Sequence, residues 1–242
     1  DDLRPLPARV RLPGQITAVS VALLLSPNDS SYFGGSLPIW LDLFLAGYLW
    51  VWFLNLFNFM DGIDGITATE TTAICAGIAL ITASTTVGLF PYAVVTAAAA
   101  LGFLWWNWPP ARVFLGDVGS ISLGFLLGWL LLSLMQEGYW AAAVILPAYY
   151  HADASLTILR RMFRGERIWQ AHKQHAYQQA VQRGWSHKAV VLTILPANIA
   201  FIGLAVLTVT KPELTGLSII LSIVIVSVII YMFQRVDEDK NL

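Results

Sequence analysis

One eight-residue stretch of the sequence combines groups that could bind a metal ion with groups that let a ligand approach closely. Residues 58–65 read Asn-Phe-Met-Asp-Gly-Ile-Asp-Gly, so Asn58, Asp61 and Asp64 recur at every third position. This spacing places the three side chains roughly on one side of a helical turn, and their oxygens suit a hard cation such as Mg²⁺. The two glycines let the backbone turn and approach a ligand. The alternative is a polar turn between two membrane spans.

Two further acidic motifs flank this stretch. Asp1 and Asp2 are adjacent carboxylates that could hold a metal or act as a base; the alternative is a solvated terminus. Residues 114–120 read Phe-Leu-Gly-Asp-Val-Gly-Ser. There Phe114 could stack on a planar base while Asp117 holds a metal, although Asp117 could equally be a plain helix N-cap.

A basic motif carries His172, Lys173 and His175, and four arginines precede it: Arg160, Arg161, Arg164 and Arg167. Cationic donors of this kind suit a phosphate or diphosphate. The alternative is charge placed for membrane topology and for attraction to anionic lipid headgroups, which explains the arginines but not the two histidines. Zinc is not expected, because the single cysteine lies in an apolar run and the acidic residues suit a harder cation.

The elements that must position these groups are membrane helices. The chain is 57% hydrophobic and 12% charged, against about 25% charged residues in soluble domains. We therefore predict one all-α polytopic membrane domain over residues 1–242, with a polar loop at 159–188. Asp42, Glu70 and Asp153 lie in or near the spans and are expected to be structural. About eight spans are expected, at residues 12–25, 37–57, 66–83, 89–106, 118–135, 139–159, 189–210 and 214–233.

The basic residues predict which loops face the cytoplasm. If residues 1–11 are cytoplasmic, all of the chain's 14 Lys and Arg except Lys211 fall in inner loops or the tail, as the positive-inside rule requires. The same topology places every polar motif described above on the inner face. This coincidence predicts a cytoplasmic active site.

Together, these motifs resemble the polyprenyl-phosphate N-acetylhexosamine-1-phosphate transferase superfamily, a glycosyltransferase family 4 group that includes the phospho-N-acetylmuramoyl-pentapeptide transferases. The resemblance covers essentially the whole chain, and the His-x-x-His-x-Tyr-Gln loop is closer to the O-antigen-initiating branch. The family fold is a bundle of about ten or eleven transmembrane helices with a cytoplasmic cleft open to a lipid groove. Since the double-Asp motif normally follows the third helix, the resemblance implies that N-terminal helices precede this sequence.

The resemblance implies roles for the donor site. Asn58 and Asp117 match the Mg²⁺ ligands, for which Mn²⁺ could substitute. Phe114 matches the aromatic residue that stacks on uracil, and Asp64 matches the residue that hydrogen-bonds it. Arg11 lies where family members place a basic residue near the diphosphate.

The catalytic residues that the resemblance implies are Asp1, Asp2, Asp61, Asp117, His172 and His175, with Lys173 as a neighbouring substrate ligand. The implied reaction transfers N-acetylhexosamine-1-phosphate from a UDP-sugar to undecaprenyl phosphate, releasing UMP, at the bacterial inner membrane. The implied partners are these two substrates and the bilayer, with a homodimer possible and no nucleic acid. The alternatives are a phospho-N-acetylmuramoyl-pentapeptide transferase, a transporter and an inactive membrane scaffold.

Overall fold

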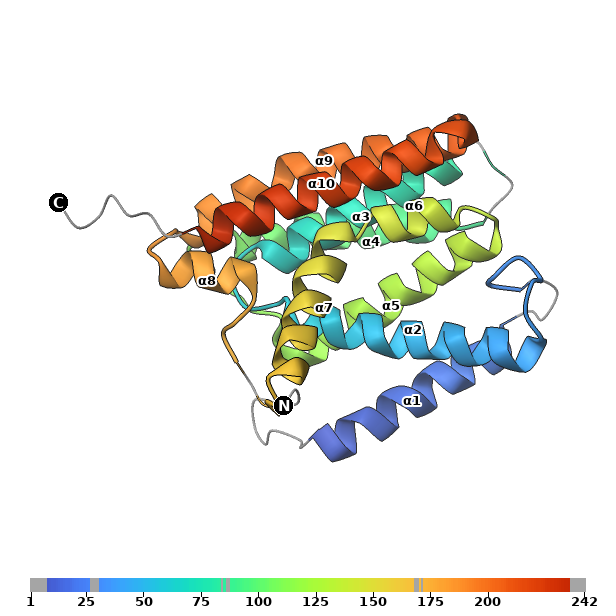
Figure 1. The fold of residues 1–242 in the computed structure, drawn as a ribbon, viewed down its shortest axis with the longest axis horizontal. Coiled ribbons are helices and arrows are strands. Elements are labelled where there is room, and N and C mark those ends of the chain that lie inside the picture. Colours follow the sequence, from blue (N-terminus) through green and yellow to red (C-terminus); the bar gives the residue numbers. More distant parts are fainter. Residues whose placement is uncertain are drawn as a thin grey trace.

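The structure, a computed structural model, describes residues 8–26, 31–83, 85, 88–167, 170 and 172–235. Over these residues the secondary structure is helical, without a strand, as the composition predicts (Figure 1). The helices in chain order are α1 (Ala8–Leu25), α2 (Ile39–Phe59), α3 (Ile66–Thr82), α4 (Phe90–Asn107), α5 (Gly116–Gln136), α6 (Trp140–Ile145), α7 (Ala148–Phe163), α8 (Ala176–Gln182), α9 (His187–Thr210), the 3₁₀ turn η1 (Pro212–Leu214) and α10 (Thr215–Gln234).

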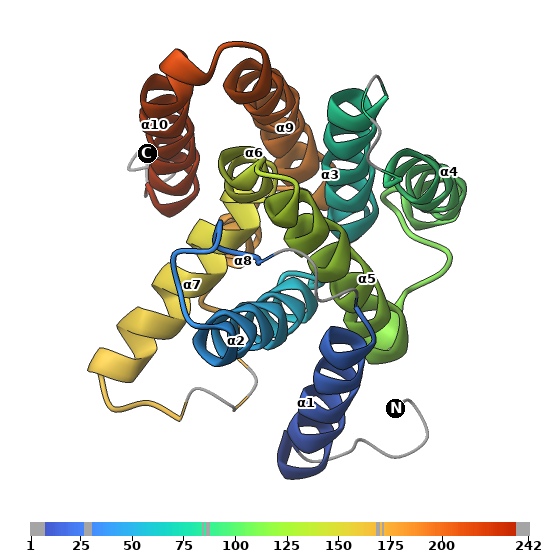
Figure 2. The ribbon, with the colours of Figure 1, turned by 90° about the vertical axis from the view of Figure 1, so that its right-hand side faces the viewer.

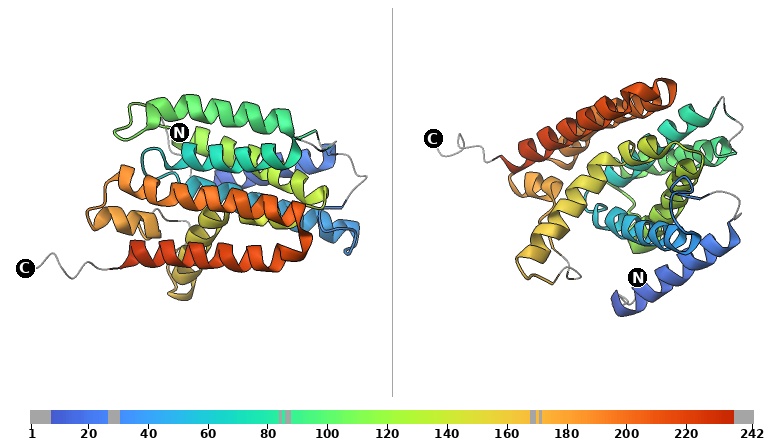
Figure 3. Two further views of the ribbon diagram at one scale, coloured as in Figure 1. Left: turned by 90° about the horizontal axis from the view of Figure 1, so that it is seen from above. Right: turned by 45° about the vertical axis from the view of Figure 1, so that its right-hand side comes forward.

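Four of the described helical segments are long and apolar enough to cross a membrane: α2, α5, α9, and η1 with α10. Helix α3 is apolar but shorter, at 17 residues. It lies between α9 and α4 (Figure 2) and is buried along most of its length. Helices α4 and α10 lie on opposite flanks of the bundle (Figure 3).

Small residues allow α2 and α5 to approach closely. A Cβ added to Gly124 would lie 3.0 Å from the Leu54 Cα, and one added to Gly128 would lie 2.4 Å from the Trp50 ring. The Trp50 indole Nε1 donates to the Phe125 carbonyl at 2.8 Å. Close packing of this kind favours helix association in lipid, where apolar surface alone supplies little driving force.

The segment predicted as one span, residues 139–159, is not one continuous helix. The segment forms two helices, α6 and α7, separated at Leu146 and Pro147. Proline lacks the N–H that an interior helical hydrogen bond needs, and its ring clashes with the preceding turn. As a result α7 leaves the line of α6 and crosses the bundle obliquely (Figure 2).

The polar segment at 159–188 contains a helix that the sequence analysis did not predict. Asp153 of α7 is buried, and its carboxylate accepts from the Ala176 and Tyr177 backbone N–H groups at 2.7 and 3.2 Å. These bonds satisfy donors at the start of α8. Asp42 likewise accepts from the Tyr32 and Phe33 N–H groups, so both acids are structural, as expected.

Candidate active site

Two of the three acidic motifs, residues 58–65 and 114–120, meet in one pocket of about 240 Å³. The segments that line it lie at the end of the bundle that carries α8 (Figure 1). Its lining includes five residues that the sequence analysis selected: Asn58, Asp61, Asp64, Phe114 and Asp117. They come from the end of α2, the α2–α3 turn, the α4–α5 loop and the start of α5. The structure therefore brings these two motifs together at one pocket.

An asparagine that the sequence analysis overlooked joins the two loops of the pocket. The Asn107 Oδ1 accepts from the Gly65 N–H at 2.8 Å, and its Nδ2 donates to the Val113 carbonyl at 2.8 Å. Gly65 has φ of 78°, a conformation that side chains with a Cβ adopt at a cost. Asn107 is itself buried, so it fixes the α2–α3 turn against the segment that carries Phe114.

Asn58 and Asp117 are each held by a partner from another segment of the chain. The Ser120 hydroxyl donates to the Asn58 Oδ1 at 2.6 Å. Asp117 lies within the first turn of α5, and the N-cap of this helix is Leu115, so Asp117 is not the N-cap residue. Its carboxylate forms an ion pair with Arg11 of α1, and both side chains are about one-third exposed.

The surroundings of Asp61 disfavour the charged form of its carboxyl group. Burial raises its pKa, the hydrogen bond from Thr67 opposes this shift, and the nearby charge of Asp117 adds to it. Two carboxylates that repel each other across a pocket are stabilised by a cation between them.

The oxygen donors of the pocket fit Mg²⁺. Among the described residues, no group of three His, Cys, Asp or Glu side chains is arranged to hold a metal. However, Mg²⁺ commonly uses only one or two protein carboxylates and completes its shell with water and substrate phosphate. Asn58, Asp61 and Asp117 supply one amide and two carboxylates around a single pocket, which matches that pattern.

Asp64 connects three segments of the site. Its Oδ2 accepts from the Ala111 N–H at 3.1 Å and lies 3.3 Å from the His187 Nδ1. The same Nδ1 lies 3.4 Å from the Asp64 backbone nitrogen. The sequence analysis missed His187, which begins α9 directly after the N-cap Ser186. Its only sequence signal is a histidine in the first turn of a helix.

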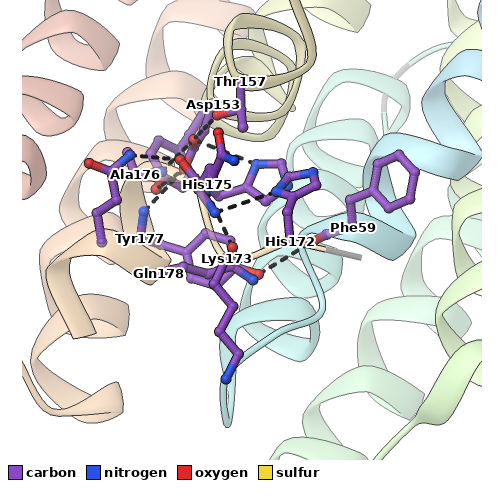
Figure 4. Close-up of polar contacts among 12 residues, drawn as sticks. Phe59, Asp153, Thr157, His172, Lys173, His175, Ala176, Tyr177 and Gln178 are labelled. Atoms are coloured by element: carbon purple, nitrogen blue, oxygen red, sulfur yellow. Dashed lines mark hydrogen bonds and ion pairs between the residues drawn. The ribbon is translucent and has the colours of Figure 1, made fainter. Parts of the chain in front are cut away.

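The histidine loop approaches the α2–α3 turn through His172 and Tyr177 (Figure 4). The Tyr177 hydroxyl donates to the Phe59 carbonyl at 3.1 Å, and a Cβ added to Gly62 would lie 2.2 Å from that hydroxyl. The His172 ring centroid is 6.5 Å from that of Phe59. Burial, followed by the charges of His175 and Arg161, lowers the pKa of His172 to about 4, so its imidazole is uncharged at neutral pH.

His175 occupies a different position from His172. Its side chain is only 1% exposed and its ring stacks on Tyr177 at 5.9 Å. The Nδ1 lies 3.8 Å from the Asp153 Oδ1. This placement directs His175 into the packing beneath the loop rather than into the acidic pocket.

The cations predicted to share one phosphate site are divided. Arg161 is buried and donates to Glu166 and to the carbonyls of Arg167 and Gln170, so it shapes the loop. Arg160, Arg164 and Lys173 line a second pocket. Asp1 and Asp2 lie outside the described residues.

An apolar groove of about 430 Å³ adjoins the acidic pocket. It is lined from α1, α2 and α7 by apolar side chains that include Ile16, Trp52 and Ile158. Asn58 lines both the groove and the acidic pocket, while Arg11 lines the groove and pairs with Asp117 of the pocket. The groove therefore opens onto the carboxylates at its polar end.

A family model described as glycosyl transferase family 4 matches residues 1–135, more than half of the chain. The chain belongs to glycosyl transferase family 4. The matched residues include α1 to α4 and nearly all of α5, and thus every described residue that lines the acidic pocket.

Individual relatives in this family are similar to the chain over different extents. It is 27% identical to a probable undecaprenyl-phosphate N-acetylglucosaminyl 1-phosphate transferase of Bacillus subtilis, over 100% of this chain and 69% of that protein. It is 32% identical to a decaprenyl-phosphate N-acetylglucosaminephosphotransferase of Mycolicibacterium smegmatis, over 93% and 64%. A phospho-N-acetylmuramoyl-pentapeptide-transferase of Mycolicibacterium vanbaalenii is 32% identical over 57% of this chain and 43% of its own length. The chain thus spans about half to two-thirds of these relatives.

Proposed function

We propose that the protein transfers N-acetylhexosamine-1-phosphate from a UDP-sugar to undecaprenyl phosphate. The observation that carries this proposal is the junction of the two cavities. A polar pocket suits the nucleotide sugar, an apolar groove suits the polyprenyl chain, and Asn58 and Arg11 stand where the two meet. An enzyme that joins a water-soluble donor to a lipid acceptor needs this arrangement.

In the proposed reaction, an oxygen of the lipid phosphate attacks the β-phosphorus of the UDP-sugar. A new phosphorus–oxygen bond forms there, the bond to the bridging oxygen breaks, and UMP leaves with that oxygen. The acceptor is already an anion, so a base is needed only to remove a residual proton. Asp1 or Asp2 is proposed for this step.

The residues of the pocket bind and orient the donor. Phe114, with 70% of its surface exposed at the pocket, is placed to stack on the base. Asp64 uses its Oδ2 for Ala111 and His187, and we assign its Oδ1 to the uracil. The Arg11 guanidinium faces the junction and stabilises negative charge that develops there. Neutral His172 serves as a hydrogen-bonding group, not as a cation.

Mg²⁺ is proposed as the cofactor, with Mn²⁺ as a substitute, held by Asn58 and Asp117 with Asp61 beside them. When bound, the ion neutralises diphosphate charge and stabilises the departing UMP. A cation in this pocket also relieves the repulsion between Asp61 and Asp117 that raises the pKa of Asp61.

The extent of the similarities favours N-acetylglucosamine over muramoyl-pentapeptide as the transferred group. The two relatives named for N-acetylglucosamine phosphotransfer align with 100% and 93% of the chain, against 57% for the pentapeptide transferase. We further propose that α1, α3, α4 and the broken α6–α7 unit also lie in the membrane. This arrangement gives about eight spans, with the acidic pocket on the cytoplasmic side of the inner membrane.

The test is transfer of labelled sugar from UDP-GlcNAc to undecaprenyl phosphate in membranes that contain the protein. We expect UMP and a butanol-soluble sugar lipid. Asp117→Asn should abolish turnover while the protein still folds and inserts, because it removes a metal ligand and the partner of Arg11. Glu137→Gln is the matched control, since Glu137 is exposed in the turn after α5. Full activity of Asp117→Asn with Mg²⁺ present would contradict the assignment.

A further inference from the structure

A second polar pocket, of about 570 Å³, lies among α7, the histidine loop, α8 and the end of α10. Four cationic side chains line it: Arg160, Arg164, Lys173 and Arg183. Among the described residues, its lining contains no carboxylate. The ion pairs of the described residues do not include Arg160, Arg164 or Lys173. This pocket therefore has a net positive charge that a bound anion would neutralise.

An apolar groove of about 580 Å³ continues from this cationic pocket between α6–α7 and α10. The two cavities share Arg160 and Gln234. The groove is lined mainly by aliphatic side chains, such as Leu156 and Ile223, which are about half exposed. Figure 2 shows α6, α7 and α10 together on this side of the bundle.

The cationic pocket and the groove that continues from it lie on a different face of α7 from the apolar groove that we propose for the polyprenyl chain. Thr157, Arg160 and Arg164 face the cationic pocket, at helical spacings of three and four. Ile158 instead lines the groove beside α1 and α2. The cationic pocket shares no described lining residue with the acidic pocket or with that groove.

We infer that this composite cavity binds an anionic glycerophospholipid. Its phosphate headgroup sits among Arg160, Arg164, Lys173 and Arg183, and its acyl chains lie in the groove between α7 and α10. Charge complementarity selects an anionic headgroup, and the connected apolar groove selects a lipid over a soluble phosphate. The inference does not depend on the transfer reaction.

The test measures retention of phosphatidylglycerol and phosphatidylcholine by the detergent-purified protein, using native mass spectrometry with equimolar lipids. We expect preferential retention of phosphatidylglycerol. The double variant Arg160→Gln/Arg164→Gln should bind phosphatidylglycerol more weakly by roughly tenfold or more. Arg9→Gln/Lys188→Gln removes the same charge from exposed positions outside the pocket and should leave retention unchanged.

A second pair of variants tests the acyl-chain groove. Ser227 lines the groove, and Val228 is exposed beside it without lining it. Ser227→Trp should fill the groove and reduce phosphatidylglycerol binding, whereas Val228→Trp should not. Inorganic phosphate is added as a competitor, which tests whether the cationic pocket binds a soluble anion in place of a lipid.

Four results would overturn the inference. The first is equal retention of the two lipids. The second is phosphatidylglycerol binding that survives both Arg160→Gln/Arg164→Gln and Ser227→Trp. The third is loss of phosphatidylglycerol binding in millimolar inorganic phosphate, which would indicate a soluble-anion site. The fourth is displacement of phosphatidylglycerol by equimolar undecaprenyl phosphate, which would assign the groove to the acceptor.

Discussion

At the scale of single residues, the Asp64 carboxylate is the contact point of three separate chain segments. It meets the loop before Phe114 through Ala111 and the start of α9 through His187. The His187 Nδ1 accepts from the Asp64 backbone N–H at 3.4 Å and lies 3.3 Å from the Asp64 carboxylate, so His187 contacts both the backbone and the side chain of Asp64. His187 is thus a positioning residue for the proposed nucleobase site.

Replacement of His187 by alanine should impair donor binding more than turnover. Loss of the hydrogen bond from the Asp64 N–H to the His187 Nδ1 leaves Asp64 less well positioned, so the KM for the UDP-sugar should rise by roughly tenfold, with a smaller effect on kcat. His187→Asn, whose amide oxygen can still accept from the Asp64 N–H, should recover most of the loss. Steady-state kinetics with varied UDP-GlcNAc measure both values. A fall in kcat at constant KM in both variants would refute the positioning role.

His172 should make the fold sensitive to acid. Its pKa is lowered to about 4 in the folded protein, against about 6.5 in an unfolded chain. Between these values the unfolded state binds a proton that the folded state does not, so stability decreases as the pH falls from 6.5 to 4. Thermal unfolding at pH 7.5 and 4.5 should show a larger fall in Tm for the wild type than for His172→Gln. Equal falls would contradict the shifted pKa.

At the scale of elements, the contact between α8 and the α2–α3 turn aligns the histidine loop with the acidic pocket. Tyr177 is fully buried, its phenol stays protonated because burial raises its pKa, and its hydroxyl donates to the Phe59 carbonyl. Gly62 leaves no room for a side chain beside that hydroxyl. The two loops therefore fit together only with glycine at this position.

Gly62→Ala should separate the two loops and reduce transfer activity by at least about tenfold. Tyr177→Phe removes the obstructing oxygen at the loss of one hydrogen bond, which contributes about 1 kcal/mol. The double variant Gly62→Ala/Tyr177→Phe should therefore be more active than Gly62→Ala alone. Activity measurements on the four proteins form a double-mutant cycle, and strictly additive losses would rule out the steric explanation.

At the scale of the whole molecule, the charge distribution and the helix directions agree. Helices α2 and α4 end, and α3 and α5 begin, at the end of the bundle that carries α8 (Figure 1). This is also the end at which the positive-inside rule places the arginines. The turns before α6 and α10, which carry Glu137 and Glu213, lie at the opposite end.

Cysteine labelling of intact cells tests this orientation. In a Cys75→Ala background, single cysteines at Glu137 and Glu213 should react with a membrane-impermeant maleimide from outside. Cysteines at Arg112 and Lys173 should react only after permeabilisation. All four native side chains are exposed, so access to reagent, not burial, decides the result. Labelling of position 112 in intact cells would invert the proposed topology.

The sequence alone determined the class of protein and five of the residues that line the acidic pocket, but not Asn107. Membrane character follows from composition. The residues proposed to bind the UDP-sugar follow from short motifs, whose residue types and spacing can be read directly from the sequence. The prediction that the basic loops face inward follows in the same way from counting charges along the chain. Such local patterns need no knowledge of packing.

Only the tertiary structure decided which groups come together when they are far apart in the sequence. Pro147 occurs within an apolar run, and packing showed that the run breaks there and forms a groove on each side of α7. The pairing of His187 with Asp64, the burial of His175 and the turning of Lys173 toward a second pocket involve contacts across helices. Helical periodicity records which face a residue occupies but not which helix meets that face, because that choice depends on packing of the entire bundle.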